Sequence, residues 1–469
     1  MLPSTDRILP PRKKKHPVVR MLSNLLFLCL GGFLVIGFQM VSNETSPLRQ
    51  WFQPPDSPHE AYLQKLQQAG LDSSSLGQKW IQAAEQSLQD SIPIELPILA
   101  RGYFSSDKPR ALTYRFEGQR GEILKVEITV MGERQPELFF DLFQQGYRSN
   151  SPFERVASAD SGSLTFEYHL NRDRQYMLRI QPGLLQSLSY EIKIHTNASL
   201  AFPVEGKDSG AIRSFWGDRR DGGKRSHKGV DIFAAKGTPA LAAIDGYVSR
   251  VKEGGLGGKV VWLRDGSRSQ SLYYAHLDTQ MVRQGQYVKK GDTLGLVGKT
   301  GNARTTPPHL HFGIYQSNVG AVNPFPFIHA QDSTFQPLGQ DTVWITQWMR
   351  TREANVSFFQ TNHSRSKTST QLLRHTPIQV ISMTHQWAEV LTSQHQRGWI
   401  QARYLEPAEE EIDLLTLARG TRIKDFAGNN AGTLFEFSDE NQVSVLAQSE
   451  DYYFIRTNKG LQGWINRGS

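Results

Sequence analysis

Residues 21–41 contain no charged side chain, and this run constrains the chain more than any other feature. As a helix rising 1.5 Å per residue it would span about 31 Å, the thickness of the hydrocarbon core of a bilayer. Six basic residues and one acid precede it in residues 1–20. Positive charge stays on the cytoplasmic side of a membrane. The pattern predicts a cytoplasmic basic tail at 1–20, a transmembrane helix at 21–41, and a chain that lies outside the cytoplasm after residue 42.

A cleaved signal peptide is the competing interpretation of this segment. The apolar run is long for a signal peptide, and no A-x-A-like cleavage site follows it. A lipoprotein signal needs a small residue before the cysteine, whereas Leu28 precedes Cys29. An uncleaved anchor is therefore favoured.

Composition narrows the chemistry of the remaining chain. A length of 469 residues allows roughly three or four domains. The formal charge of +8 favours anionic partners, but no basic run outside the N-terminus indicates nucleic-acid binding. Cys29 is the single cysteine, so neither an intrachain disulfide nor a cysteine-based zinc site is possible. Any metal site must use histidine and carboxylate ligands.

Residues 55–91 have the pattern of two short helices, and we expect a helical stalk there. Ser57 precedes a proline and a glutamate in a helix-starting pattern, Gly70 ends the first helix, and Ser75 begins the capping segment of the second. Nothing in this segment indicates catalysis.

Residues 99–196 alternate apolar and polar positions in strand-length runs separated by Gly, Asn and Asp turns. Each run places its apolar residues on one face: Leu124, Val126, Ile128 and Val130; Tyr176, Leu178 and Ile180; Tyr190, Ile192 and Ile194. The pattern predicts a β-sandwich. It resembles the pre-peptidase modules found beside secreted bacterial proteases, although it fits a spacer without a ligand equally well.

The last 120 or so residues contain a weak repeat, in which an aromatic strand precedes Gly-Trp-Ile. The separation from Trp387 to Trp399 equals that from Tyr452 to Trp464. The repeat resembles bacterial SH3-like barrels, which often bind cell-wall peptides. We expect Trp399 and Trp464 to pack inside their barrels. Two SH3-like modules are predicted, at 340–408 and 412–469.

Three short segments within residues 200–330 carry the informative histidines: His227-Lys228-Gly229-Val230-Asp231, Tyr273-Tyr274-Ala275-His276-Leu277 and His309-Leu310-His311-Phe312. Side chains at i and i+2 of a strand point to one face, so His309 and His311 project together. Both could share a metal, or one could bind the metal while the other acts on its water. Gly229 permits a bend that could bring His227 and Asp231 to one point.

Taken together, the segments supply two histidines and an aspartate, a ligand set that suits zinc and leaves a fourth position for water. With one anionic ligand the site keeps a net positive charge, which favours ionisation of the bound water and polarises a carbonyl. A further histidine near the metal could orient that water or accept its proton.

The stretch 214–325 resembles peptidase family M23, the lysostaphin/LytM-like zinc endopeptidases. The motifs follow the family order: HKGVDI for H-x-G-x-D, YAHL for Y-x-H-L, a glycine-rich approach to PHLHF, and a closing Asn323-Pro324. The resemblance implies an antiparallel-sheet peptidase domain at 200–330 that holds one Zn²⁺ per chain. It implies metal ligands His227, Asp231 and His311. It also implies that His276 and His309 activate water and stabilise the oxyanion.

The expected protein is thus a mainly β, multidomain zinc endopeptidase of the bacterial inner membrane, with its catalytic part in the periplasm or otherwise outside the cytoplasm. Its substrate would be peptidoglycan, as cross-links or stem peptides, in cell-wall remodelling. Two alternatives remain. One is a non-catalytic peptidoglycan-binding regulator that activates another hydrolase; the other is a scaffold whose sandwich and SH3-like modules carry the function. Protein partners cannot be inferred from the sequence.

The orientation predicted from the N-terminus can be tested with topology reporters. We expect an alkaline phosphatase fused after residue 60 to be active, because the preceding positive charge holds residues 1–20 inside. A reporter that works only in the cytosol should fail at the same position. The reverse result would contradict the anchor.

Overall fold

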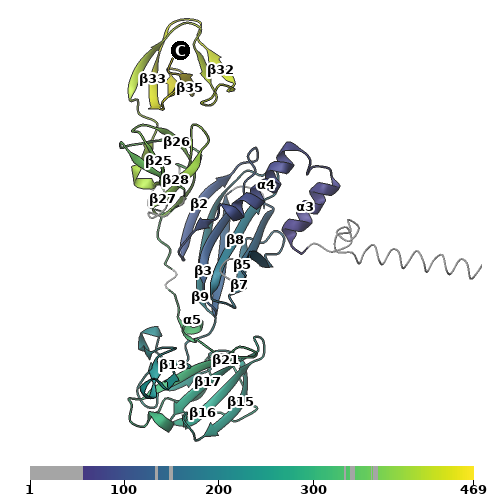
Figure 1. Ribbon diagram of the computed structural model, residues 1–469, viewed down its shortest axis with the longest axis vertical. Coiled ribbons are helices and arrows are strands. Elements are labelled where there is room, and N and C mark those ends of the chain that lie inside the picture. Colours follow the sequence, from purple (N-terminus) through teal and green to yellow (C-terminus); the bar gives the residue numbers. More distant parts are fainter. Residues whose placement is uncertain are drawn as a thin grey trace, which may run out of the picture. The chain divides into compact units, whose positions relative to one another are not determined.

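The computed structural model describes residues 56–131, 136–146, 152–331, 334–338, 344–360, 362 and 368–468. The tail predicted at 1–20 and the transmembrane helix predicted at 21–41 lie outside these residues. Within them, no helix combines the length and hydropathy needed to span a bilayer. The described chain is mainly β, as predicted, and its α-helices are α3 (Pro58–Gln68), α4 (Ser75–Gln89) and α5 (Phe325–Ile328) (Figure 1).

Helix α4 packs against the neighbouring sheet instead of standing apart as a stalk. Its N-cap is Ser74, one residue before the expected position, and the Ser74 side chain accepts a hydrogen bond from the Gly77 backbone N–H. Trp80 is buried, and its indole Nε1 donates to the Pro182 carbonyl oxygen at 2.8 Å. In return, the Gln181 side chain donates to the Trp80 carbonyl oxygen. A tryptophan with both its ring and its carbonyl engaged fixes α4 on this sheet.

Residues 92–198 form two sheets around one core, and the apolar faces predicted from the sequence are the buried ones. The first sheet has the order β1 (Ile92–Pro93), β3 (Leu112–Gly118), β8 (Arg174–Pro182), β5 (Leu138–Gln145) and β6 (Phe153–Ser158). The second contains β2 (Ile98–Phe104), β9 (Leu188–Ala198), β4 (Glu122–Met131) and β7 (Thr165–His169).

The second sheet continues into the C-terminal part of the chain, which the local sequence pattern does not indicate. Strand β2 pairs with β26, so that Ala100 lies opposite Thr384 and Gly102 opposite Ser382. From β26 (Pro377–Thr384) the sheet continues through β27 (Trp387–Thr392), β28 (Arg397–Gln401), β24 (Val356–Phe359) and β25 (Thr368–Leu372). Strand β23 (Trp348–Thr351) also pairs with β26, and β29 (Leu405–Pro407) pairs with β23.

A buried carboxylate reinforces this junction. The side chain of Glu389 is fully buried and accepts hydrogen bonds from Arg110, Arg397 and Ser382. Burial alone would raise the pKa of Glu389, but the two guanidinium groups hold it at about 2. The charge is thus compensated on every side, as a buried ion requires.

Both tryptophans of the Gly-Trp-Ile repeat are buried, as expected. Trp464 packs with Phe454 and Leu446 of its own module, whereas the expectation for Trp399 is wrong. Trp399 belongs to the core cluster of the sandwich, together with Trp387. Trp464 lies against Trp348 of the preceding module, with ring centroids 4.9 Å apart. The last module consists of β30 (Asp413–Leu417), β31 (Arg422–Lys424), β32 (Thr433–Glu436), β33 (Asn441–Gln448), β34 (Tyr452–Thr457) and β35 (Gln462–Asn466). Its SH3-like nature, and that of the module before it, stays a prediction.

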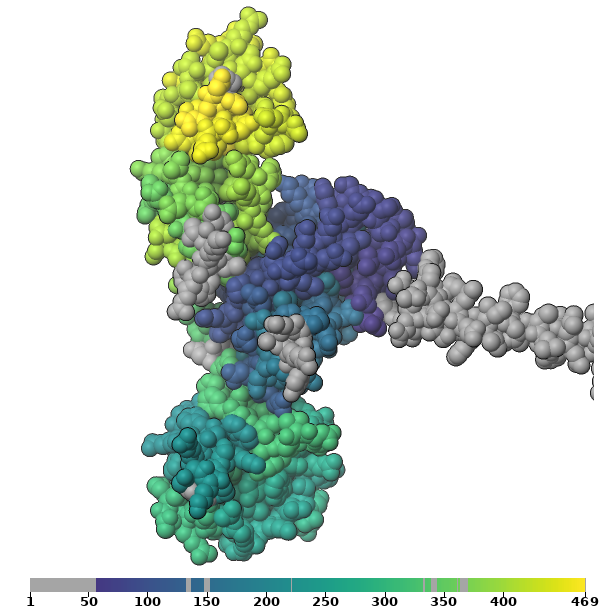
Figure 2. All heavy atoms as spheres, viewed as in Figure 1, coloured from purple at the N-terminus to yellow at the C-terminus, as the bar shows by residue number. Residues whose placement is uncertain are grey.

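The domain with the histidine segments is built on an eight-stranded antiparallel sheet (Figure 1). Its order is β10 (Ile212–Ser214), β13 (Val230–Phe233), β21 (His309–Gln316), β17 (Gln270–Leu277), β16 (Lys259–Asp265), β15 (Gly246–Glu253) and β19 (Tyr287–Val288), with β22 (Gly320–Val322) beside β21. Three short strands form a second sheet: β14 (Pro239–Leu241), β20 (Thr293–Leu296) and β18 (Thr279–Gln280). In Figure 2 these residues are coloured teal to green.

Candidate metal centre

The pairing of β13 with β21 places the first site residues. Asp231 lies directly opposite His311, and Phe233 lies opposite His309. Every second residue of both strands, including Val230 and Leu310, is fully buried in the domain core. Because side chains alternate along a strand, Asp231, His309 and His311 project from the other face.

His227 reaches the same point from the loop before β13, and Gly229 makes room for it. The backbone of Gly229 is not left-handed, so the glycine is not needed for a special bend. A Cβ at this position would lie 2.6 Å from the Phe312 carbonyl oxygen and 2.7 Å from Cε1 of His311. Both distances are too short for real atoms. The glycine of H-x-G-x-D therefore allows the loop to approach the His311 ring.

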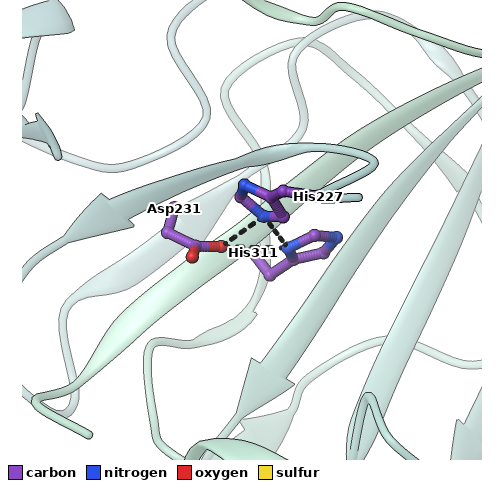
Figure 3. A group of neighbouring side chains, drawn as sticks. All are labelled: His227, Asp231 and His311. Atoms are coloured by element: carbon purple, nitrogen blue, oxygen red, sulfur yellow. Dashed lines mark hydrogen bonds and ion pairs between the residues drawn. The ribbon is translucent and has the colours of Figure 1, made fainter. Parts of the chain in front are cut away.

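Three potential ligand atoms converge at this place (Figure 3). His227 Nε2 lies 3.0 Å from Asp231 Oδ1 and 3.0 Å from His311 Nδ1, and the last two atoms are 2.9 Å apart. Burial raises the pKa of Asp231, but the contacts with the two histidines bring it below its usual range. The carboxyl group is therefore ionised at neutral pH.

The chemistry of this donor set fits a metal ion. His227 Nδ1 lies 2.8 Å from the Phe215 carbonyl oxygen, which can only accept a hydrogen bond, so the neutral ring carries its proton there and leaves Nε2 bare. Three lone-pair atoms about 3 Å apart require a cation or a proton between them. Tetrahedral zinc with bonds of roughly 2.0–2.1 Å has ligand atoms about 3.3–3.4 Å apart, close to the separations found here.

His276 enters the site through an irregularity in strand β17. Lys259 of β16 pairs with Leu277 and Val261 pairs with Tyr274, so β17 carries one extra residue between these pairs. At this bulge His276 has a φ of +62°, a left-handed conformation that is uncommon for histidine. Its backbone N–H donates to the Gly257 carbonyl oxygen at 2.8 Å. The bulge turns the imidazole toward the other site histidines.

The rings of His276 and His309 lie edge to face beside the triad, with centroids 5.1 Å apart. Each ring also has Nδ1 at 2.9 Å from a backbone carbonyl oxygen, that of Thr300 for His276 and that of Pro307 for His309. The protons of the neutral rings therefore lie on Nδ1, and both Nε2 atoms remain available. Burial, together with the neighbouring His309 and His311, lowers the pKa of His276 to about 4. His276 is thus neutral at pH 7.

Arg220 contacts the proposed ligand Asp231, which the sequence does not reveal. Arg220 donates from NH2 to Asp231 Oδ2 at 2.5 Å and to Ser214 Oγ at 2.6 Å. Oδ2 is thereby engaged, whereas Oδ1 faces His227 and His311. By sequence alone Arg220 belongs to a basic loop with Arg219 and Lys224, and no local pattern separates it from them. Only the folded structure shows that Arg220 contacts Asp231 of β13.

All five predicted site residues line one groove of about 710 Å³. The segment around His227 lies on the β13 side of β21 and forms one wall. The loops around Gly257 and Ala303 lie on the β17 side, where the His276 N–H donates to Gly257, and form the other wall. Tyr273 adds an aromatic surface, with its ring centroid 5.9 Å from that of His311. The groove is open to solvent, and it can admit a polymer segment to the triad.

Comparison with known proteins places this domain in a family. Residues 225–324 match the model of peptidase family M23, in agreement with the resemblance seen in the sequence. The domain is an M23 peptidase domain.

Several relatives match part of this chain. An L-Ala–D-Glu endopeptidase of Bacillus subtilis is 36% identical over 28% of this chain and 43% of its own length. The peptidoglycan DD-endopeptidase ShyC of Vibrio cholerae is 40% identical over 19% of this chain and 20% of its own length. Among solved structures, the catalytic domain of the antimicrobial peptidase lysostaphin from Staphylococcus simulans is 33% identical, with a TM-score of 0.23. That match covers 25% of this chain and 90% of the lysostaphin domain. The chain thus spans less than half the length of these two curated relatives.

The close approach at Gly229 predicts the effect of adding one methyl group. We expect Gly229→Ala to lose zinc binding and to lower the unfolding temperature, because the new Cβ displaces the His311 ring and overpacking costs about 1–3 kcal/mol. Gly266→Ala is the matched control, since a Cβ there meets nothing within 4 Å. Zinc content per chain and thermal unfolding measure both effects. Full zinc occupancy in Gly229→Ala would contradict the packing argument.

The contact of Arg220 with Asp231 predicts a weaker zinc site when the guanidinium is removed. Residues that orient metal ligands typically contribute 10–100-fold to metal affinity, and we expect a loss of about this size in Arg220→Gln. Arg219→Gln removes the same charge from the exposed neighbouring position and should leave the affinity unchanged. Competition with a chromogenic chelator measures the affinities. Equal affinities of the two variants would mean that Arg220 does not position Asp231.

Proposed function

We propose that this protein is a zinc-dependent endopeptidase that hydrolyses peptide bonds of peptidoglycan, in cross-links or stem peptides. The observation that carries the proposal is the convergence of one metal triad and two further imidazoles in a single open groove. The names of the relatives support the substrate, since one is an L-Ala–D-Glu endopeptidase and another a peptidoglycan DD-endopeptidase.

The triad of His227, Asp231 and His311 would hold the ion. Zinc bound there supplies a Lewis acid that polarises a carbonyl and lowers the pKa of a water molecule. Asp231 contributes the one negative charge of the ligand set, and Arg220 holds its second oxygen.

The two remaining histidines would handle the proton and the developing charge. Since His276 and His309 each have Nδ1 at a backbone carbonyl, their bare Nε2 atoms can accept a proton from the attacking water. A ring that has accepted this proton becomes an N–H donor on the groove side. It can then donate to the oxyanion or deliver the proton to the leaving amine. One of the two rings would accept this proton as the base and then act as the donor, and the other would remain neutral beside it.

The wider setting of the enzyme is proposed from the sequence. Residues 21–41 would anchor the chain in the bacterial inner membrane, with the peptidase domain on the outer side, where peptidoglycan lies. The SH3-like modules and the sandwich would contact the wall or space the domain from the membrane.

The sharpest test separates metal ligands from catalytic residues. Alanine at His227, Asp231 or His311 should remove zinc and activity together, because each change deletes one of three protein ligands. His309→Ala and His276→Asn should keep about one zinc per chain and lose about 10²–10⁴ in turnover. Asparagine is chosen at His276 because it tolerates the left-handed backbone. Metal content and hydrolysis of cross-linked peptidoglycan are measured on the same preparations.

Three results would overturn parts of this assignment. Full zinc occupancy in His311→Ala would remove that residue from the ligand set. Wild-type turnover in both His309→Ala and His276→Asn would remove the catalytic roles. If the unaltered protein binds wall polymer but hydrolyses none, the regulator hypothesis replaces the enzyme.

A further inference from the structure

The groove that holds the site is lined by more cationic residues than acidic ones. Four of its lining residues are cationic, namely Arg220, Lys224, Arg225 and Lys228, whereas Asp231 is the one acid among the lining residues. Since Asp231 would be a metal ligand, its charge is compensated within the site. A bound divalent ion would add further positive charge. A groove with low-dielectric walls focuses such a field and attracts anions.

This charge is confined to one wall. All four cations lie within residues 220–228, in the hairpin of β11 (Arg219–Arg220) and β12 (Arg225–Ser226) and in the segment that leads to β13. The facing wall is lined by Leu256, Gly257, Asn302, Ala303 and Thr306, none of which is charged. A peptide lying across the triad would therefore meet cations on one side of its cleaved bond and neutral groups on the other.

The hairpin itself concentrates like charges. Strands β11 (Arg219–Arg220) and β12 (Arg225–Ser226) pair so that Arg220 lies opposite Arg225. Like charges directly opposite each other destabilise a two-stranded ladder. Arg220 is compensated by Asp231, but Lys224 and Lys228 remain exposed on either side of this pair.

We propose that residues 220–228 form a carboxylate-binding subsite, so that the substrate is a peptide with free carboxylates on one side of the cleaved bond. This inference rests on the proposed endopeptidase function. Lys224 and Lys228 bind the carboxylates, while Arg220 stays with Asp231. The occupant is an acidic peptide because the cations border the groove that leads to the triad, where a peptide bond has to lie.

The experiment compares two synthetic wall peptides that differ only in whether the carboxylates next to the cleaved bond are free or amidated. The zinc-loaded full chain should cleave the free form with about five- to tenfold higher kcat/KM, as expected for two exposed ion pairs. In Lys224→Met/Lys228→Met this ratio should fall to between about one and two. High salt should reduce the wild-type ratio, because exposed charges are screened.

A second double variant serves as the matched control. Lys207 and Lys290 are exposed lysines of the same domain that do not line the groove. Lys207→Met/Lys290→Met changes the net charge by the same amount and should keep the wild-type ratio. If it loses the ratio equally, the preference arises from the charge of the whole domain and the subsite is wrong. The subsite is also wrong if the wild type cleaves both peptides equally or if Lys224→Met/Lys228→Met keeps the wild-type ratio.

Binding of the same two peptides, labelled with a fluorophore, gives a measurement that is independent of turnover. If neither peptide is cleaved, the proposed endopeptidase function is wrong for these substrates. The subsite is then supported by tighter binding of the free form to the wild type but not to Lys224→Met/Lys228→Met, and refuted by equal binding. The two failures are therefore distinguishable.

Discussion

The register between β13 and β21 is the constraint on which the site depends. It sets Asp231 opposite His311, and it is fixed by the apolar residues that alternate with them. Val230, Ile232 and Leu310 are fully buried, and each contributes roughly 1.5–3 kcal/mol through burial. A slip of one residue would turn this apolar set toward the groove and the ligands into the core. Hydrophobic burial on one face thus fixes the geometry of the polar groups on the other.

The fourth and fifth residues of the site, His309 and His276, are positioned in two different ways. His309 extends β21 by the ordinary alternation that also places His311. His276 depends on a bulge and on a left-handed backbone. This conformation costs free energy and persists only where the surrounding structure holds it in place. A glycine-rich loop that packs against this bulge holds it in place. A Cβ at Gly298 would lie 2.4 Å from the Asp278 backbone nitrogen and 2.8 Å from the His276 carbonyl oxygen.

These two ways of positioning explain how far the sequence predicts the site. The period of two in a strand is local, so the shared face of His309 and His311 follows from the sequence alone. The resemblance to a family supplied the ligand set, because nothing local connects His227 with His311 across 84 positions. The role of Arg220 and the pairing of β2 with β26 were not predicted, since both depend on long-range register. Trp399 was predicted to be buried but not to pack with the sandwich.

The main chain orients three of the four site histidines in the same way. In His227, His276 and His309, Nδ1 lies against a main-chain carbonyl oxygen, so the backbone sets both the ring orientation and the tautomer. A substitution of the residue that provides the carbonyl leaves this acceptor in place. His311 differs, because its Nδ1 faces Asp231 and His227. The pairing of β21 with β13 positions the His311 ring, and Gly229 leaves room for it. The site is therefore preorganised largely by backbone groups, which explains why glycines and strand register matter as much as the five polar side chains.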